Sequence, residues 1–168
     1  MNSCTPQQIN ARRQNGFTLV EIMIAVVIVA ILAAVALPSF LDSVRKSRRA
    51  DAFTAITTVQ QAQERWRGSK AQYATQAELT IGVSAVPPGL GLSTDTSARY
   101  YTLALLNIDA SQYTVVATAV AGKSQDQDGA CKVLGVRVRG GNVVYGAAAA
   151  APVNFDVADP DSGRCWAR

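Results

Sequence analysis

The sequence predicts an α+β protein in which one long N-terminal helix packs on a four-stranded antiparallel sheet. An apolar run from Phe17 to Leu37 is followed by a helical pattern of apolar positions. Four segments rich in β-forming residues follow in the second half of the chain. The last two segments are separated by Gly140 and Gly141, a pair typical of a tight hairpin.

The apolar run is long enough to cross a membrane as a helix. Its 21 residues from Phe17 to Leu37 correspond to about 31 Å of helix, close to the thickness of the hydrocarbon layer. Glu21 is the single charge within it. The alternative is a buried helix of a soluble protein, which we disfavour because the remaining chain is short for enclosing a helix that is apolar on every side. We therefore expect a membrane segment over residues 17–40.

Residues 1–16 have the composition of a leader that is removed. They contain Arg12 and Arg13, no acidic residue, and end at Gly16. A secretory signal places its apolar core before the cleavage site, whereas here the apolar segment follows Gly16. Cleavage after Gly16 would therefore leave the hydrophobic helix on the mature protein.

The helical pattern resumes after Pro38, which should kink the helix because proline lacks a backbone N–H. An apolar stripe follows at alternating spacings of three and four residues, with Phe53 beside it, and consists of Ala52, Ile56, Val59, Gln63 and Trp66. Gly68 is a plausible end of the helix. We expect an amphipathic half-helix over residues 41–68 that packs on a sheet.

The remaining chain divides into a loop region and a sheet region. Residues 69–99 contain two prolines and several glycines, and their apolar residues follow no regular spacing. This composition indicates a loop with at most one short turn. The strand signals lie at 100–106, 112–119, 131–139 and 142–146, and an alanine run and a polar tail follow them. We expect residues 100–168 to form the sheet and a C-terminal region.

The cysteines indicate on which side of the membrane the C-terminal part of the chain lies. Cys4 would leave with the leader, and the remaining pair, Cys131 and Cys165, fits one disulfide in an oxidising compartment; two buried free thiols are the alternative. Four basic residues just after the apolar run favour a cytoplasmic C-terminal part instead: Arg45, Lys46, Arg48 and Arg49. We give the disulfide more weight, because large C-terminal domains can cross a membrane despite flanking charge.

The segment "GFTLVEIMIAVVIVAILAAVALPSF", residues 16–40, resembles the prepilin signature of type IV pilins and related pseudopilins. Glycine at the cut, phenylalanine after it and glutamate four residues on match Gly16, Phe17 and Glu21. The resemblance implies the type IV pilin fold, with the long helix on a four-stranded antiparallel sheet. It also implies that a prepilin peptidase cuts Gly16–Phe17 on the cytoplasmic side and N-methylates Phe17.

The resemblance further implies a role for Glu21 and a set of partners. A carboxylate at membrane depth is costly and is therefore usually functional. In pilin filaments the equivalent glutamate is thought to pair with the N-terminal amine of a neighbouring subunit; snorkelling to the headgroups is the alternative. The implied partners are membrane lipid before assembly, the inner-membrane pilus assembly machinery, and other pilin subunits in an extracellular pilus, with the C-terminal domain periplasmic before assembly.

The segments "ERWRGSKAQYATQAEL" (64–79) and "YTVVATAVAGKSQDQDGAC" (113–131) more loosely resemble minor pilins of the PilE kind. Minor or major status, and use of the pilus in cell adhesion, twitching motility or DNA uptake, stay open at this point. One departure concerns Ala30, where many pilins have a glycine at which the helix unwinds. Because alanine favours helix over glycine, unwinding between Ala30 and Pro38 is left open.

Catalytic and cofactor motifs are absent from the sequence. Without histidine, triads that need it cannot form, and zinc would lack ligands beyond the two cysteines. "GLGL" (89–92) has neither the lysine nor the spacing of a phosphate loop. "QDQDGA" (125–130) is similar to the core of an EF-hand calcium loop. The last ligand of such a loop would have to be a carboxylate at position 135, where this chain has glycine, so we expect a solvated turn. We expect no enzyme activity, no cofactor and no metal.

A set of basic residues is a candidate DNA contact. Arg137 and Arg139 alternate with valines and should share the outward face of a strand, with Lys132 and Lys123 near in sequence. Ordinary solvated charge is the alternative explanation. The leading hypothesis is a structural subunit of a type IV pilus, more in keeping with a minor than a major pilin. The alternatives are a DNA-uptake minor pilin of the ComP kind, a type II secretion pseudopilin and, last, a membrane-anchored enzyme.

Overall fold

The structure is a computed structural model that describes residues 16–155 and 160–166. The chain divides into two compact units, Met1–Phe40 and Leu41–Arg168. The predicted leader, apart from Gly16, lies outside the described residues. The second unit contains the whole sheet and every buried residue of the hydrophobic core.

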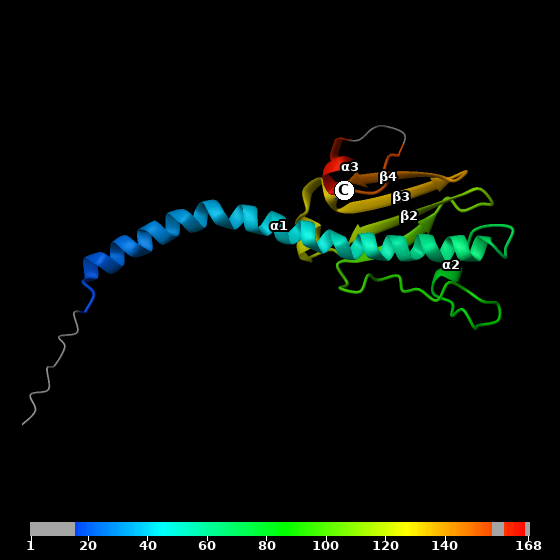
Figure 1. Cartoon of the computed structure of the whole chain (residues 1–168), viewed down its shortest axis with the longest axis horizontal. Helices are drawn as coiled ribbons and strands as arrows, with labels where there is room; N and C mark the ends of the chain where they lie inside the picture. The colour runs from blue at the N-terminus through cyan, green and yellow to red at the C-terminus, as the bar shows by residue number, and fades with distance from the viewer. Residues whose placement is uncertain (1–15, 156–159, 167–168) are drawn as a thin grey trace, which may run out of the picture. The chain divides into compact units, whose positions relative to one another are not determined.

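The described residues confirm the predicted α+β fold (Figure 1). Four antiparallel strands form one sheet in the order β1-β2-β3-β4. Three helices and two short 3₁₀ turns complete the fold. The elements are α1 (Leu19–Arg67), α2 (Gln76–Leu79), β1 (Tyr101–Leu106), β2 (Gln112–Ala119), the 3₁₀ turns Ser124–Gln127 and Gly129–Cys131, β3 (Val133–Arg139), β4 (Asn142–Ala148) and α3 (Pro160–Cys165).

The strand boundaries differ from the prediction at three places, and the first is β1, which begins at Tyr101 rather than at residue 100. β3 begins at Val133 rather than at Cys131, because Cys131 ends the 3₁₀ turn Gly129–Cys131 and Lys132 follows that turn as its C-cap. β4 continues to Ala148 into the alanine run, since its register with β3 pairs Ala148 with Val133. The β3–β4 turn is as expected: Gly140 and Gly141 have φ of 55° and 82°, a left-handed conformation that glycine adopts without a steric penalty.

The part of α1 in the second unit buries one stripe, which confirms the predicted amphipathic pattern. Its buried positions are Ala52, Ile56, Val59, Ala62 and Gln63. They share one core with alternate residues of the strands, among them Leu103, Leu105, Val115, Leu134, Val136 and Val138. The period of 3.6 on the helix and of 2 on the strands brings both apolar faces together. Gln63 fits this core because its amide exchanges two hydrogen bonds of 2.8 Å with the backbone of Ala74.

The region 69–99 contains one capped helical turn, α2. The Glu78 carboxylate accepts a hydrogen bond from the backbone N–H of Thr75 at 2.7 Å, and Leu79 is completely buried. This arrangement is half of a capping box, which fixes the start of a helix too short to be stable alone. The prediction of at most one short turn in this region agrees with the structure.

The opposite face of the sheet carries a second, smaller core. Val153 packs with Val116 and Val133, and Phe155 lies against this cluster. A side-chain carbon at Gly135 or Gly146 would come within 2.7 Å of Phe155 or within 2.5 Å of Val153, respectively. These two glycines therefore allow the segment that follows β4 to lie directly on the sheet.

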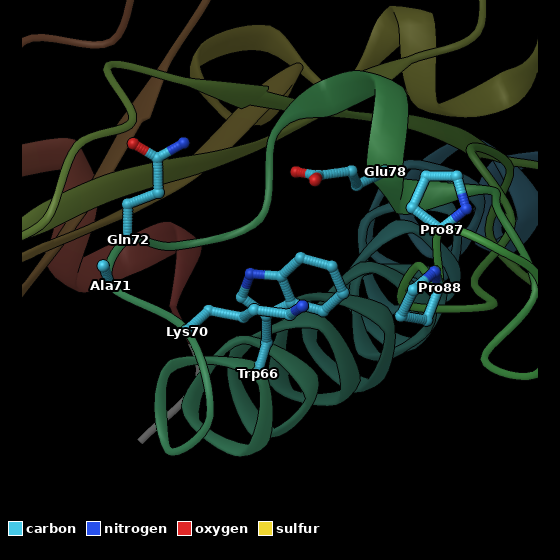
Figure 2. A pocket seen from close by; sticks show the side chains of 7 residues that line it. All are labelled: Trp66, Lys70, Ala71, Gln72, Glu78, Pro87 and Pro88. Atoms are coloured by element: carbon cyan, nitrogen blue, oxygen red, sulfur yellow. The ribbon is translucent and has the colours of Figure 1, made fainter.

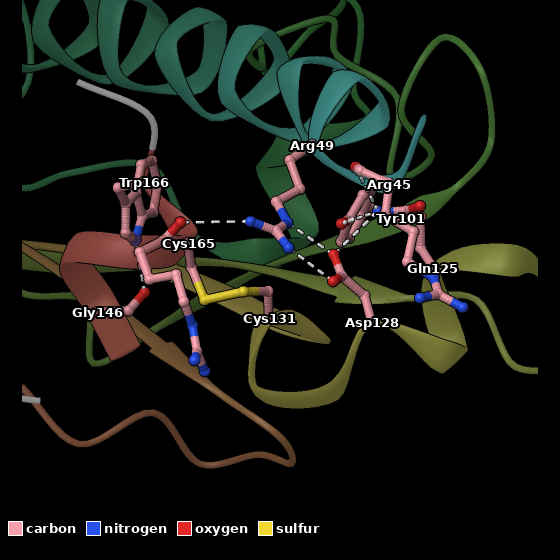
Figure 3. The surroundings of a disulfide bond; sticks show 10 residues. Arg45, Arg49, Tyr101, Gln125, Asp128, Cys131, Gly146, Cys165 and Trp166 are labelled. Atoms are coloured by element: carbon pink, nitrogen blue, oxygen red, sulfur yellow. Dashed lines mark hydrogen bonds and ion pairs between the residues drawn. A yellow bond between two sulfur atoms is a disulfide. The ribbon is translucent and has the colours of Figure 1, made fainter. Parts of the chain in front are cut away.

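A disulfide joins Cys131 to Cys165, with Cα atoms 5.5 Å apart (Figure 3). It connects the second 3₁₀ turn to α3, in a tail for which the sequence predicted no helix. Beside it, Trp166 stacks on Phe53 with ring centroids 4.8 Å apart and donates its indole N–H to the Gly146 carbonyl at 2.9 Å. The described part of the tail is therefore fixed to both α1 and β4.

Candidate assembly helix and candidate nucleic-acid contacts

The predicted processing site lies at the start of the described chain. Gly16, Phe17 and Thr18 are not helical, and α1 begins at Leu19. Phe17 is 78% exposed, and a side-chain carbon at Gly16 would meet no atom within 4 Å. Glu21 lies in the first turn of α1, and its backbone N–H donates to the Thr18 hydroxyl at 3.2 Å.

The apolar part of α1 has almost no partner within its own unit. From Gly16 to Phe40 every residue is exposed except Ala33, which is half-buried. By length and composition, α1 is the one helix of the described chain that could cross a membrane. The segment from Ala30 to Pro38 is helical throughout, and Pro38 lies inside α1; the predicted kink and any unwinding in a filament stay predictions.

The structure does not bring the three proposed DNA contacts into one patch. Arg137 and Arg139 both project from β3 on the face opposite the main core, as expected from their alternation with buried valines. Lys132 precedes β3 at its other end, about 23 Å from Arg139 at about 3.3 Å per residue. It forms an ion pair with Asp126 at 3.3 Å.

Arg139 is exposed, whereas Arg137 is only half-exposed. The Arg137 guanidinium lies 5.2 Å from the Phe155 ring centroid and donates to the Phe155 carbonyl at 3.4 Å. Beside it is a groove of about 450 Å³ between the sheet face and residues 151–155, lined in part by Thr114 and Val116. Lys123, the fourth basic residue considered, is exposed and donates to the Arg99 carbonyl at 2.6 Å.

Two of the four basic residues after the apolar run, Arg48 and Arg49, point into the domain. Arg49 forms two hydrogen bonds of 2.7 Å with the Asp128 carboxylate, and both side chains are largely buried (Figure 3). Arg48 donates to the Ser124 hydroxyl and lies 4.8 Å from the Tyr100 ring centroid. Hydrogen bonding to Asp128 raises the pKa of Arg49 above its ordinary value.

The signal for Arg49 was present in the sequence. It stands three residues before Ala52 and therefore continues the buried stripe by one helical step. Arg45, one further step along the same stripe, pairs instead with the exposed Asp42 at 2.9 Å. Register therefore places Arg49 on the inward side of the helix, but its partner, 79 residues further on, could not be identified from the pattern.

The expectation of a solvated turn at 125–130 is wrong for Gln125 and Asp128, whereas Gln127 and Gly129 are exposed. Gln125 is completely buried and donates to the Tyr101 hydroxyl at 2.8 Å, and Asp128 is 7% exposed. Asp126 accepts from the Gly122 backbone, which lowers the pKa of its carboxyl. These carboxylates are thus used in contacts with the protein, and the described residues hold no cluster of three metal-ligating side chains.

A shallow hollow of about 180 Å³ lies at the C-terminal end of α1 (Figure 2). Trp66 forms its floor, Lys70 lies 5.4 Å from the Trp66 ring centroid, and Pro87 and Pro88 line one side. The Glu78 carboxylate at its edge caps α2, and Lys70 is held over an aromatic ring. Neither side chain is placed for acid–base catalysis.

Comparisons with known proteins agree with this geometry. Residues 11–37 match the family model of the prokaryotic N-terminal methylation motif. The chain is 39% identical over 61 residues to the type IV major pilin protein PilA of Myxococcus xanthus, covering 36% of the chain and 28% of PilA. It is 52% identical over 40 residues to the fimbrial protein EcpC of Eikenella corrodens, covering 24% of the chain and 26% of EcpC.

A third relative is the type II secretion system core protein G of Vibrio cholerae, 36% identical over 64 residues, or 38% of the chain and 44% of that protein. The chain thus spans about a quarter to less than half of the length of these relatives. A second family model, described as the type IV minor pilin ComP, DNA uptake sequence receptor, matches residues 38–135. This match covers more than half of the chain, which therefore belongs to the family of type IV minor pilins.

Proposed function

We propose that the chain is cleaved between Gly16 and Phe17 by a prepilin peptidase, is anchored in the inner membrane by residues 17–40, and then enters a type IV pilus as a minor subunit. N-methylation of Phe17 follows cleavage, and residues 41–168 lie on the periplasmic side before assembly. The observation that supports this proposal is the exposure of the apolar helix: its side chains must find partners outside the chain. Lipid supplies them first and neighbouring helices afterwards.

Glu21 is the assembly residue in this proposal. On insertion scales a charged side chain costs about 2.5–3.5 kcal/mol at the centre of a membrane helix, so Glu21, in the first turn of α1, weakens anchoring by at most this amount. In a filament it would meet the amine of Phe17 from a neighbouring subunit, where low effective dielectric strengthens the attraction. The two charges then compensate each other inside a bundle of apolar helices.

Replacement of Glu21 tests this role. Glu21→Ala and Glu21→Gln should be cleaved after Gly16 and accumulate in the inner membrane, yet enter filaments poorly. The reason is that a buried amine without its partner costs about 3–5 kcal/mol, more than the gain in insertion. Immunoblots of sheared pili and membrane fractions measure the distribution, and Met23→Leu, which keeps the helix apolar, should assemble normally. Normal incorporation of both Glu21 variants would leave Glu21 as a snorkelling residue only.

The processing step has its own measurement. Mass spectrometry of the mature protein should find an N-terminus at Phe17 carrying one methyl group. A chain that still begins at Met1 in a piliated cell would contradict the proposal directly. Non-reducing peptide mapping of the same sample should show Cys131 linked to Cys165, which supports the periplasmic orientation.

A second candidate function is DNA binding. It is favoured by the family model over residues 38–135, whose description names a DNA uptake sequence receptor, and by the exposed Arg139 beside Arg137 on β3. The formal net charge of +4 is too small to support it alone. Lys132 contributes less in this proposal, because it is paired with Asp126 at the other end of the strand.

Fluorescence anisotropy of labelled duplex DNA tests this candidate on the full chain in non-ionic detergent. Binding should weaken steeply with salt, and Arg137→Glu with Arg139→Glu should lower the affinity about tenfold or more, since each removes a phosphate contact and adds repulsion. Arg65→Glu, an exposed arginine of α1, is the matched control. No binding at low ionic strength would end this candidate and leave the filament role untouched.

A further inference from the structure

Six residues at the start of α1, "FTLVEI" (17–22), form a helix-capping pattern that their role in the membrane does not require. Thr18 precedes the first helical residue and accepts two hydrogen bonds. Its carbonyl accepts from the Ile22 N–H at 3.2 Å, the first bond of the helix, and its hydroxyl accepts from the Glu21 N–H at 3.2 Å. Thr18 is therefore the N-cap of α1.

The neighbouring residues complete this pattern. Thr18 and Glu21 have the T-x-x-E spacing of a capping box. Phe17, before the cap, and Ile22, four positions into the helix, have the spacing of a hydrophobic staple, which fixes the direction of the entering chain. The first N–H groups of a helix have no partner within it, and near a membrane water satisfies them poorly. A cap therefore defines strongly where this helix starts.

We propose that Thr18 is a positioning residue for leader cleavage. Because its cap makes the helix begin at Leu19, the Gly16–Phe17 peptide bond stays outside the helix. In the reaction water adds across that bond, so that Gly16 gains a carboxylate and Phe17 an amine. A peptidase pairs with an extended substrate through its backbone groups, and the first turn of a helix already uses the carbonyl groups of its residues as acceptors. The open space around Gly16 and the 78% exposure of Phe17 fit such access. This inference rests on the proposed cleavage.

The sequence indicates where the helix would start without this cap. Asn15, known here from the sequence alone, is the next residue upstream with a side chain suited to an N-cap. A helix capped there would place Gly16 and Phe17 in its first turn. The loss of the Thr18 hydroxyl should thus enclose the bond that the peptidase must reach.

Cleavage kinetics of the full-length chain in detergent, with the prepilin peptidase of the same organism, test this role. Thr18→Val keeps the size of the side chain and removes the acceptor, so kcat/KM should fall about 5–10-fold. Thr18→Ser keeps the hydroxyl and should remain within about twofold of wild type. Val20→Leu changes a first-turn side chain that takes no part in the cap and should also be cleaved normally. Asn15→Ala added to Thr18→Val should restore at least part of the rate, because it removes the alternative start.

The outcomes separate this inference from the proposed function. If the wild-type chain is not cleaved, the proposed processing fails. If the wild type is cleaved and Thr18→Val is cleaved equally fast, the positioning role is overturned. If Thr18→Ser is as slow as Thr18→Val, the peptidase recognises the threonine itself, which also overturns the role. Slow cleavage of Thr18→Val with rescue by both Thr18→Ser and the double variant supports it.

Discussion

The two parts of α1 share one backbone conformation and have opposite surroundings. Residues 41–67 bury one stripe against the sheet, and Ile56 and Val59 are each 1% exposed. Residues 19–40 are apolar on every side, yet Ile28 and Leu32 are 52% and 64% exposed. A one-sided pattern shows that a helix finds its partner within the chain. An all-round apolar pattern whose side chains are exposed within their own unit is what a helix that packs against other molecules would have.

The charges of the two parts differ in the same way. In the domain, the charge of Arg49 is compensated inside the chain by Asp128 through two hydrogen bonds of 2.7 Å. Glu21, the one ionisable side chain between Phe17 and Phe40, makes no ion pair with a described residue. Removal of Asp128 should therefore lower the stability of the domain, whereas removal of Glu21 should impair assembly.

The largest effect on stability is expected for Asp128→Ala. It leaves the largely buried Arg49 guanidinium without its carboxylate, which should lower the free energy of unfolding by about 3–5 kcal/mol. Urea unfolding of the full chain in detergent, followed by near-UV circular dichroism, measures it. Asp42→Ala removes an exposed ion pair with Arg45 and should cost less than about 1 kcal/mol. Equal losses of unfolding free energy in the two variants would mean that the buried ion pair stabilises the domain no more than the exposed one.

The disulfide should have the next largest effect. Replacing Cys131 and Cys165 with serine opens a loop with a sequence separation of 34 residues, which in the chain-entropy model lowers stability by roughly 3–4 kcal/mol. Reductant should destabilise the wild type by a similar amount and leave the double variant unchanged. A double variant as stable as the oxidised wild type would show that the packing of Trp166 alone holds the tail.

Periodic features of the chain could be predicted from the sequence. The stripe on α1, the alternation of Val136 and Val138 in β3 and the glycine pair before β4 each follow from local geometry, and the structure agrees with them. The α+β class follows from the order of these features. The apolar run could be recognised by length and composition, because a membrane segment needs no particular partner.

Contacts between distant, non-periodic segments could not be predicted. Asp128 and Gln125 lie in a polar stretch that has the composition of a solvated turn, and they are buried only because Arg49 and Tyr101 face them. The covering of Arg137 by Phe155 depends on two glycines in different strands that admit the segment. Such pairings depend on tertiary placement, which sequence periodicity does not contain.

Alkaline pH should act on the domain, where tyrosine side chains are buried. Burial raises the pKa of Tyr113 above its ordinary value of 10. A raised pKa in the folded state contributes stability that is full below pH 10 and is lost as pH rises from there toward the folded pKa. Tyr113→Phe should therefore reduce the loss of urea stability between pH 9 and 11, by about 1 kcal/mol. An unchanged pH dependence in this variant would place the titrating group elsewhere.

The last prediction tests the comparison most directly, because the same change from isoleucine to valine is made at two positions of α1. Ile56→Val removes a methylene from the core and should lower the free energy of unfolding by about 0.5–1.5 kcal/mol. Ile28→Val makes the same change where the side chain is 52% exposed, so the unfolding of the domain in detergent should not change. In filaments the order should reverse: if Ile28 packs against neighbouring helices, Ile28→Val should lower the temperature at which sheared pili dissociate, while Ile56→Val leaves it unchanged. A loss of domain stability in Ile28→Val would show that residues 19–40 do have a partner within the chain, and the comparison would fail.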